Sequence, residues 1–162
     1  MTSAAGISVS TVSTTQLAPL GFRLTVPQGD NGIAEYVYVK TANEIEAGEI
    51  AIQSGVTPYL AELSGSTIEA NKTFGVAQVT IASGSYGFVL ARGYCPIIRT
   101  ASTTAPAAGA QIESDASGMA TDNGLADEAA VAANLGHQLT VGAADTTIGS
   151  GTYGTAMIDC RG

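Results

Sequence analysis

The sequence predicts a mainly β protein: an antiparallel β-barrel or sandwich with a Ser/Thr-rich N-terminal arm and at most one short helix, at about 124–135. Short runs rich in β-branched and aromatic residues recur along the chain, and Gly- and Pro-rich turns separate them. A length of 162 residues suits one domain that can bury a core without disulfides or metal. We therefore expect an arm over 1–16 and a single β domain over 17–162.

The N-terminal arm is dominated by Ser and Thr, and residues 2–16 include no charged side chain. Ile7, Val9 and Val12 make the segment too β-prone for a simple solvated linker. Two interpretations stay open: a frayed terminus, or an arm that orders by adding a strand to a partner's sheet edge. In the second, Ile7, Val9 and Val12 contact a partner protein or a neighbouring subunit.

Two pairs of short strands follow the arm. Residues 20–26 and 34–40 are β-prone, and the segment between them contains Pro27, Gly29 and Gly32, which favour a turn. GEIAIQ at 48–53 and TPYLAELS at 57–64 repeat the pattern of short strand, turn and short strand.

The clearest element is a β-ribbon over 74–98. Two apolar runs, Phe74–Ile81 and Phe88–Ile98, flank ASGSYG, which has the composition of a hairpin loop. Both faces of the ribbon are apolar, so it is buried on both or lies between a domain core and another subunit. The second alternative places five residues at an oligomer interface: Phe74, Val76, Phe88, Leu90 and Tyr94.

The C-terminal third begins with a small-residue linker at 100–110 and a strand–turn–strand at 109–122. An Ala-rich helix is predicted from Gly124 to Gly136, with Asp122 or Asn123 as its N-cap. Residues 137–161 again have the pattern of strand, Gly-rich loop and strand. Cys95 and Cys160 fit free buried thiols of a reducing compartment, although a bridge in a mature extracellular particle stays open.

An acidic stretch at 109–128 resembles a calcium loop at first sight. Its carboxylates belong to Glu113, Asp115, Asp122, Asp127 and Glu128. An EF-hand that starts at either of the first two aspartates lacks the required ligands and the central Gly, and no sugar cleft adjoins the acids for a glycosidase. We interpret the stretch as a turn, with a calcium site of other geometry as the minor alternative.

The remaining motifs predict no catalytic, cofactor-binding or metal residues. His137 has no nucleophile elbow beside it, and one His with two distant Cys is a weak zinc set. The Gly-rich loops at 84–87 and 149–151 lead into strands and not into helix N-termini, so they predict hairpin loops and not phosphate loops.

The charge balance disfavours polyanionic partners. Fourteen acidic against six basic side chains give a net charge of −8, and no Lys/Arg cluster offers the basic footprint that nucleic acid or an anionic membrane needs. The first Lys or Arg is Arg23, so no signal peptide is predicted, and no run approaches the roughly 20 apolar residues of a membrane span. We expect synthesis in a cytoplasm.

The order of features over about 70–162 resembles that of tailed-bacteriophage capsid cement, or head decoration, proteins. It is carried by FGVAQVTIASGSYGFVLARGYCPI, the small-residue linker, AGAQIESDASGMATD, a Gly-His strand and GTYGTAMIDCR. The resemblance implies a non-enzymatic virion protein on the capsid surface, commonly a homotrimer, that clamps subunits of the major capsid protein. A phage tail, neck or fibre component is one alternative, and a β-barrel carbohydrate-binding or hydrolase domain is another.

Overall fold

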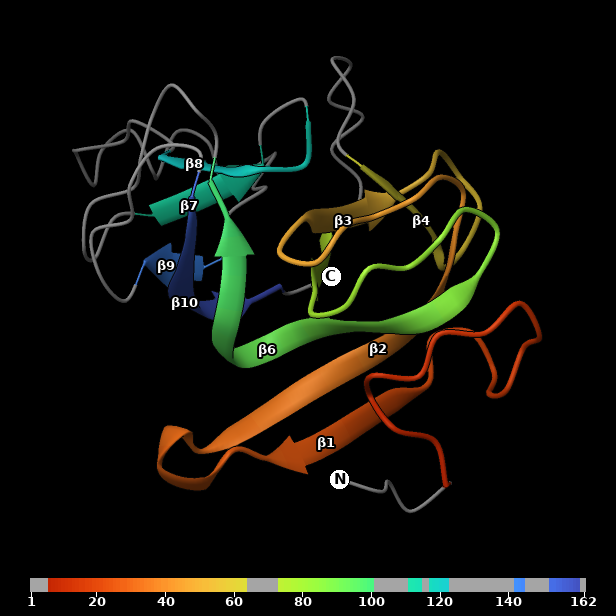
Figure 1. The fold of residues 1–162 in the computed structure, drawn as a ribbon, viewed down its shortest axis with the longest axis horizontal. Helices are drawn as coiled ribbons and strands as arrows, with labels where there is room; N and C mark the ends of the chain where they lie inside the picture. Colours follow the sequence, from red (N-terminus) through yellow and green to blue (C-terminus); the bar gives the residue numbers. More distant parts are fainter. Residues whose placement is uncertain are drawn as a thin grey trace.

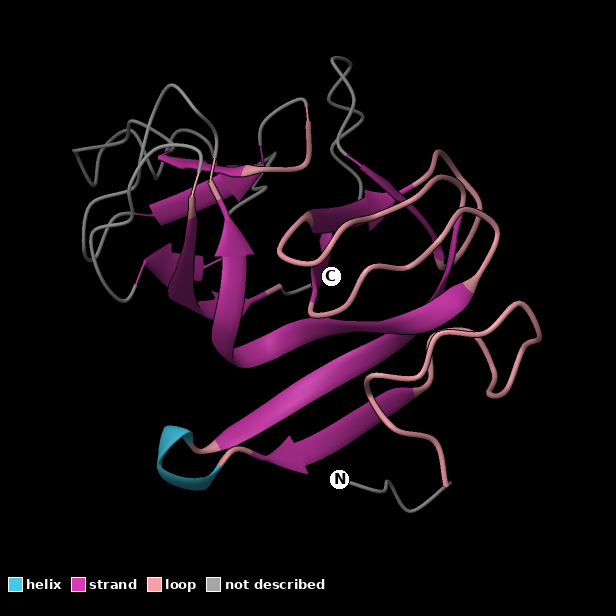
Figure 2. Cartoon of the chain, in the orientation of Figure 1, coloured by secondary structure: helices cyan, strands magenta, loops and turns pink. Residues whose placement is uncertain are grey.

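The structure, a computed structural model, describes residues 6–63, 73–100, 111–114, 117–122, 142–144 and 152–160. The fold is mainly β, as predicted (Figure 2). Its elements are β1 (Arg23–Pro27), the 3-10 turn η1 (Gly29–Asn31), β2 (Ile33–Thr41), β3 (Ile50–Gln53), β4 (Leu60–Leu63), β5 (Thr73–Ala77), β6 (Tyr86–Arg99), β7 (Gln111–Ser114), β8 (Ala120–Asp122), β9 (Gly142–Ala144) and β10 (Tyr153–Asp159). The helix predicted at 124–135 lies outside the described residues.

Five strands close into a small barrel. β2 pairs with β4, β4 with β3, β3 with β5 and β5 with β6, and β6 pairs in turn with β2. The β2–β4 pair is parallel, and the other four are antiparallel. Closure gives strand partners to backbone groups that an open sheet would leave unpaired at its edges. The predicted class, a barrel or sandwich, is confirmed as barrel-like.

Small and branched apolar side chains fill the barrel. One buried cluster draws members from all five of its strands: Val37, Val39, Ile45, Ala51, Ala61, Phe74, Ala77, Ile81, Val89 and Ala91. Alanines recur in this set because the interior of a five-stranded barrel is narrow. The interior is therefore packed by side chains from strands and from the segments that join them.

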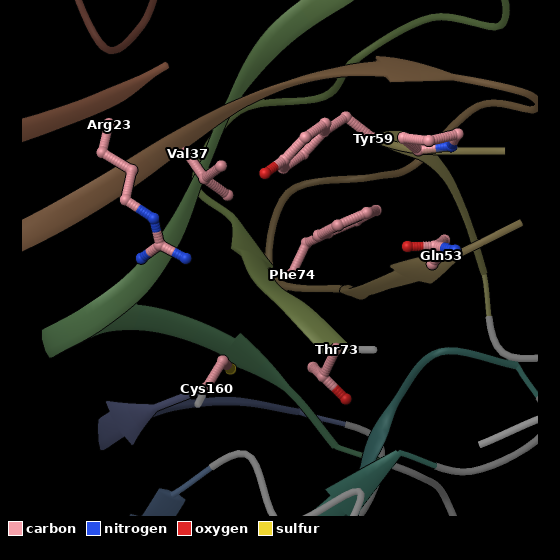
Figure 3. Close-up of a pocket in the computed structure, with 8 residues that line it drawn as sticks. Arg23, Val37, Gln53, Tyr59, Thr73, Phe74 and Cys160 are labelled. Atoms are coloured by element: carbon pink, nitrogen blue, oxygen red, sulfur yellow. The ribbon is translucent and has the colours of Figure 1, made fainter. Parts of the chain in front are cut away.

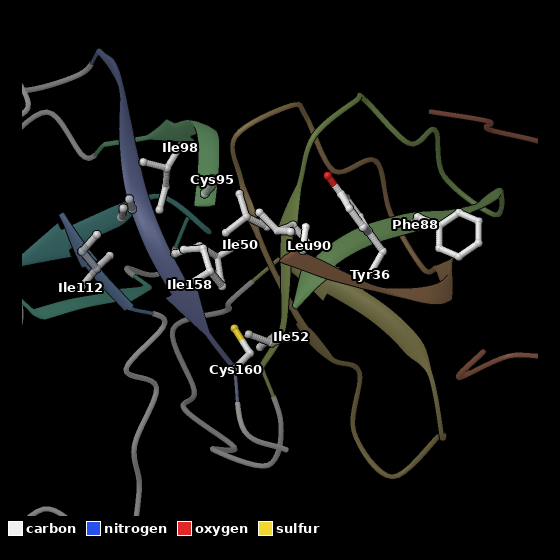
Figure 4. Close-up of a cluster of buried hydrophobic side chains, with 14 of the residues drawn as sticks. Tyr36, Ile50, Ile52, Phe88, Leu90, Cys95, Ile98, Ile112, Ile158 and Cys160 are labelled. Carbon is white, nitrogen blue, oxygen red and sulfur yellow. The ribbon is translucent and has the colours of Figure 1, made fainter. Parts of the chain in front are cut away.

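The outer face of the barrel is buried as well. Phe88 and Leu90 of β6 alternate with Val89 and Ala91, and they belong to a second buried cluster. That cluster extends across β10 to Ile112 of β7, and Figure 4 shows Phe88 at one end and Ile112 at the other. One continuous core thus joins the barrel to the second part of the sheet, whose strand order is β6-β10-β9-β7-β8.

β6 belongs to both parts of the sheet, and an irregularity in its pairing accompanies the change of partner. Glu35 pairs with Arg92 but Tyr36 pairs with Leu90, so Ala91 is the extra residue of a β-bulge. Beyond it, β6 leaves β5 and pairs with β10. Figure 1 shows the sharp bend of β6 between these two parts.

A second bulge lies further along β6, near Pro96. Cys95 pairs with Ala156 and Ile98 pairs with Gly154, which leaves one residue too many in β6. Proline is tolerated in a strand at such a position because no ladder hydrogen bond is lost. A bulge reverses the in-and-out alternation, and Cys95 and Ile98 consequently both face the shared core.

The strand pairs predicted from the sequence are confirmed with small shifts of their ends. β1 and β2 form the first antiparallel pair around η1, and β3 pairs with β4. β5 and β6 are the two strands of the predicted ribbon. β7 and β8 pair across the acidic stretch, with Ile112 fully buried and Gly118 in the left-handed region at φ +74°. The described residues of the stretch, 111–114 and 117–122, are two paired strands with a turn at 117–118, as predicted for this part.

Cys95 and Cys160 are free and buried in the shared core. Cys95 pairs with Ala156 of β10, and Cys160 lies four residues after Ala156. At the usual rise of a strand, these four residues separate the Cα atoms of Cys160 and Ala156 by about 13 Å. A disulfide needs Cα atoms within about 7 Å. The register therefore disfavours an intramolecular bridge, and both thiols are free in this chain.

The close approach of β5 to β6 requires glycine at position 75. Gly75 has φ +148°, and a Cβ there would lie 2.0 Å from the carbonyl oxygen of Leu90. We predict that Gly75→Ala lowers the free energy of unfolding by about 3 kcal/mol or more, measured by urea denaturation. Gly84→Ala is the control, because Gly84 is also left-handed but has open space around it, and it should cost only about 1–2 kcal/mol. Equal losses would contradict the close approach.

Burial should also keep both thiols unreactive. It raises the pKa of Cys95 to about 11 and that of Cys160 to about 12, so both stay protonated and shielded at pH 8. We predict no fast labelling by a thiol reagent in native buffer and two labelled thiols in denaturant. Rapid native labelling, or a mass two hydrogens below that of the reduced chain, would contradict this.

Candidate docking surface

An exposed apolar strip crosses the sheet where β2, β6 and β10 lie side by side. Ile33 is 65% exposed, Met157 is 49% exposed and Tyr94 is half-buried. Tyr94 and Met157 are directly paired across β6 and β10, and the carbonyl of Ile33 lies close to Gly93, which precedes Tyr94. These three residues, here called the apolar strip, place apolar side chains on three neighbouring strands.

Charged side chains border the apolar strip. Glu35 pairs with Arg92, and Arg92 pairs with Asp159, so the row across three strands alternates in sign. Glu35 also forms an ion pair with Arg23. A groove of about 610 Å³ runs between these groups and includes Ile33 and Met157 in its walls. An apolar centre with a charged rim is the usual composition of a protein interface.

The side chain of Gln28 holds the apolar strip in place. Its amide donates to the carbonyl of Tyr94 at 2.8 Å and accepts from the Tyr94 N–H at 3.1 Å. These bonds imitate a strand pairing at the point where β6 changes partners. A Cβ at Gly93 would lie 2.7 Å from the oxygen of Ile33 and 3.2 Å from that of Gln28, so glycine permits this approach.

The described part of the predicted arm, residues 6–16, lies on its own domain. Ser13 exchanges two backbone hydrogen bonds with Tyr86 of β6, at 3.0 and 2.8 Å. Ile7 and Val9 are partly buried against the shared core, while Val12 is 37% exposed. The arm therefore adds to a sheet of its own chain, and Val12 is the residue of the three with the most surface left for a neighbour.

Both apolar faces of the predicted ribbon pack into the buried clusters of the chain itself. Phe74 and Val76 are at most 7% exposed, and Phe88 and Leu90 have no exposed surface. Side chains so buried offer no contact area to a second copy, so their placement at an oligomer interface has to be corrected. Tyr94 is the residue of the predicted set that contributes to the exposed apolar strip.

The apolar strip was not predicted from the sequence, although a signal for it exists. Tyr153, Met157 and Asp159 alternate with the core residues Ala156 and Ile158 along β10. This period of two shows that one face of β10 is turned outward. Ile33 has no such signal, because a lone Ile at the start of a strand is more often a core residue.

An ion-pair cluster joins the barrel to the end of β6. Arg99 contacts Glu46 at 2.6 Å and the buried Glu49 at 3.0 Å, and Glu49 accepts a hydrogen bond from the N–H of Glu46. The single guanidinium neutralises the buried carboxylate, which would otherwise be costly. Its partners are satisfied within the chain, so the cluster is structural.

No group of three or more His, Cys, Asp or Glu side chains in the described ranges could hold a metal ion. No helix there is long and apolar enough to cross a membrane. Asp115, Asp127, Glu128 and His137 lie outside the described residues.

Comparison with family models and with curated proteins found no match for this chain. No family model matches it, and no curated protein matches it at a significant level. The functional argument therefore depends on the surface itself.

Removing the Gln28 side chain should destabilise the fold at the apolar strip. We predict that Gln28→Ala lowers the free energy of unfolding by about 1–3 kcal/mol, because the N–H and carbonyl of Tyr94 lose their partners. Gln53→Ala is the matched control, since that amide bonds only to the exposed carbonyl of Gly55, and it should cost less than about 0.5 kcal/mol. Equal effects in chemical denaturation would contradict the role of Gln28.

Proposed function

We propose that this chain is a non-enzymatic virion structural protein, a capsid decoration protein that binds the outer surface of a phage head. The observation that carries the proposal is the apolar strip, which stays exposed while the two large apolar clusters of the described residues are buried. Exposed apolar surface of this kind is retained where a partner covers it. The partner proposed here is the major capsid protein.

A decoration protein needs a surface that is complementary to its partner and does not need catalytic groups. It binds many equivalent positions on a lattice, so modest contacts gain avidity when copies associate. A homotrimer would present the apolar strip three times around one axis. The net charge of −8 keeps free copies soluble and gives no attraction to packaged DNA.

The rigidity of the apolar strip supports this role. Met157 and Tyr94 sit on paired strands, and Gln28 fixes the backbone of Tyr94. Anchors that are already ordered lose little conformational entropy on binding. Bridging neighbouring capsid subunits through ordered anchors would stabilise the head against internal pressure.

A charge placed at the centre of the apolar strip should weaken head binding. We predict that Met157→Lys reduces affinity by about tenfold or more, because truncation or disruption of central anchors typically has effects of that size. Val56→Lys is the control, since Val56 is 90% exposed in the turn between β3 and β4, away from the strip. The assay adds each variant to heads prepared without this protein and measures bound protein after sedimentation.

Three outcomes would contradict the proposal. Unchanged occupancy of Met157→Lys would remove the apolar strip from the interface. Failure of the unmodified protein to bind heads would remove the capsid as partner. Recovery of the protein only from tails, at tens of copies or fewer per virion, would favour the tail or fibre alternative.

A further inference from the structure

A cavity of about 320 Å³ opens beside the barrel, and Arg23 in its lining connects it to Glu35 at the border of the apolar strip. Its lining comes from β1, β2, β3, β5, the turn between β3 and β4, and Cys160 after β10. Val37 and Phe74, which also belong to the interior cluster, form its apolar floor. The volume lies at the small end of the range for ligand sites, which suits a compact molecule.

One wall of the cavity is held in an uncommon conformation. Tyr59 has φ +55°, and it is the one non-glycine residue in the described ranges with positive φ. Its ring stacks on Phe74 with centroids 5.8 Å apart and planes 21° apart. Gly21 makes room for the ring, because a Cβ there would lie 2.4 Å from it. Backbone strain of this kind collects at ligand clamps.

Two polar groups face the opening. Figure 3 shows the Tyr59 hydroxyl directed toward Val37 and the Arg23 guanidinium beyond Val37, at the other side of the cavity. Glu35 engages one nitrogen of Arg23, and the guanidinium, half-exposed, carries five N–H donors in all. Donors therefore remain for a planar acceptor such as a carboxylate, which guanidinium groups bind in a fork.

We propose that this cavity binds a small planar aromatic carboxylate. The ring packs against Tyr59 and Pro58, the apolar lining residues with exposed surface, above the buried Val37 and Phe74. The carboxylate takes hydrogen bonds from Arg23 and from the Tyr59 hydroxyl. Cys160 lines the far wall as a protonated thiol, so binding is non-covalent.

The opposing interpretation is that Tyr59 is only a plug at the side of the barrel. The two interpretations differ in the role of Arg23, which a plug does not need. The two interpretations also differ in the expected affinities. A binding site prefers a charged ligand to a neutral one of the same shape, whereas a plugged barrel shows no such preference. The acidic net charge gives no long-range attraction, so the affinity has to come from these contacts.

Naphthoate is the probe, and its binding is followed by amide NMR on the full chain. We expect shifts confined to β1, residues 58–60 and β5, with a dissociation constant of about 1 mM or tighter for a ligand of this size. Naphthalenemethanol, of the same shape without charge, should bind about fivefold more weakly. Arg23→Gln should lower the affinity for naphthoate by a similar factor and leave the affinity for the alcohol unchanged.

Two variants separate the site from general effects. Tyr59→Phe keeps the aromatic ring in the cavity wall and removes the hydroxyl, so it should lower the affinity for naphthoate about twofold to fivefold. Arg92→Gln removes a charge that lines the other groove and should change nothing. The proposal is overturned if naphthoate causes no shifts at this cavity, if it binds elsewhere, or if Arg23→Gln leaves its affinity unchanged. None of these outcomes bears on head binding, which uses the apolar strip.

Discussion

β6 forms ladders with β2, β5 and β10 and buries side chains on both of its faces, and this double burial sets where the other elements can lie. Val89 and Ala91 close the barrel interior, while Phe88 and Leu90 require a cover on the outside. Each fully buried large side chain contributes about 1.5–3 kcal/mol to the free energy of unfolding. Exposing the whole outer face to water would therefore cost several times that amount. The N-terminal segment and the second part of the sheet supply the cover.

The two bulges in β6 let this strand belong to both parts of the sheet. The extra residue at Ala91 lies where β6 passes from β5 to β10, and the one near Pro96 returns the alternation so that Ile98 faces the same core as Cys95. Outside these faces the sheet presents Ile33, Tyr94 and Met157 to solvent. The proposed docking surface is thus a by-product of where β6 changes partners.

Much of the fold could be predicted because local patterns decide it. In four pairs, two short β-prone strands are joined by Gly, Pro or polar residues: β1–β2, β3–β4, β5–β6 and β7–β8. The bulges could not be predicted, since they depend on which strand lies opposite. The site was missed for a related reason: the apolar runs of Phe88 and Leu90 have the composition of an interface, and only the three-dimensional cover shows that the chain itself fills them.

The most direct test of this account is amide hydrogen exchange of residues 86–91, compared between the free protein and the protein bound to heads. If the chain itself buries both faces of β6, these amides exchange slowly in the free protein at every concentration, and binding leaves their rates unchanged. Fast exchange in dilute free protein, with protection appearing only on self-association or on heads, would mean that another chain covers the ribbon. That result would contradict the account.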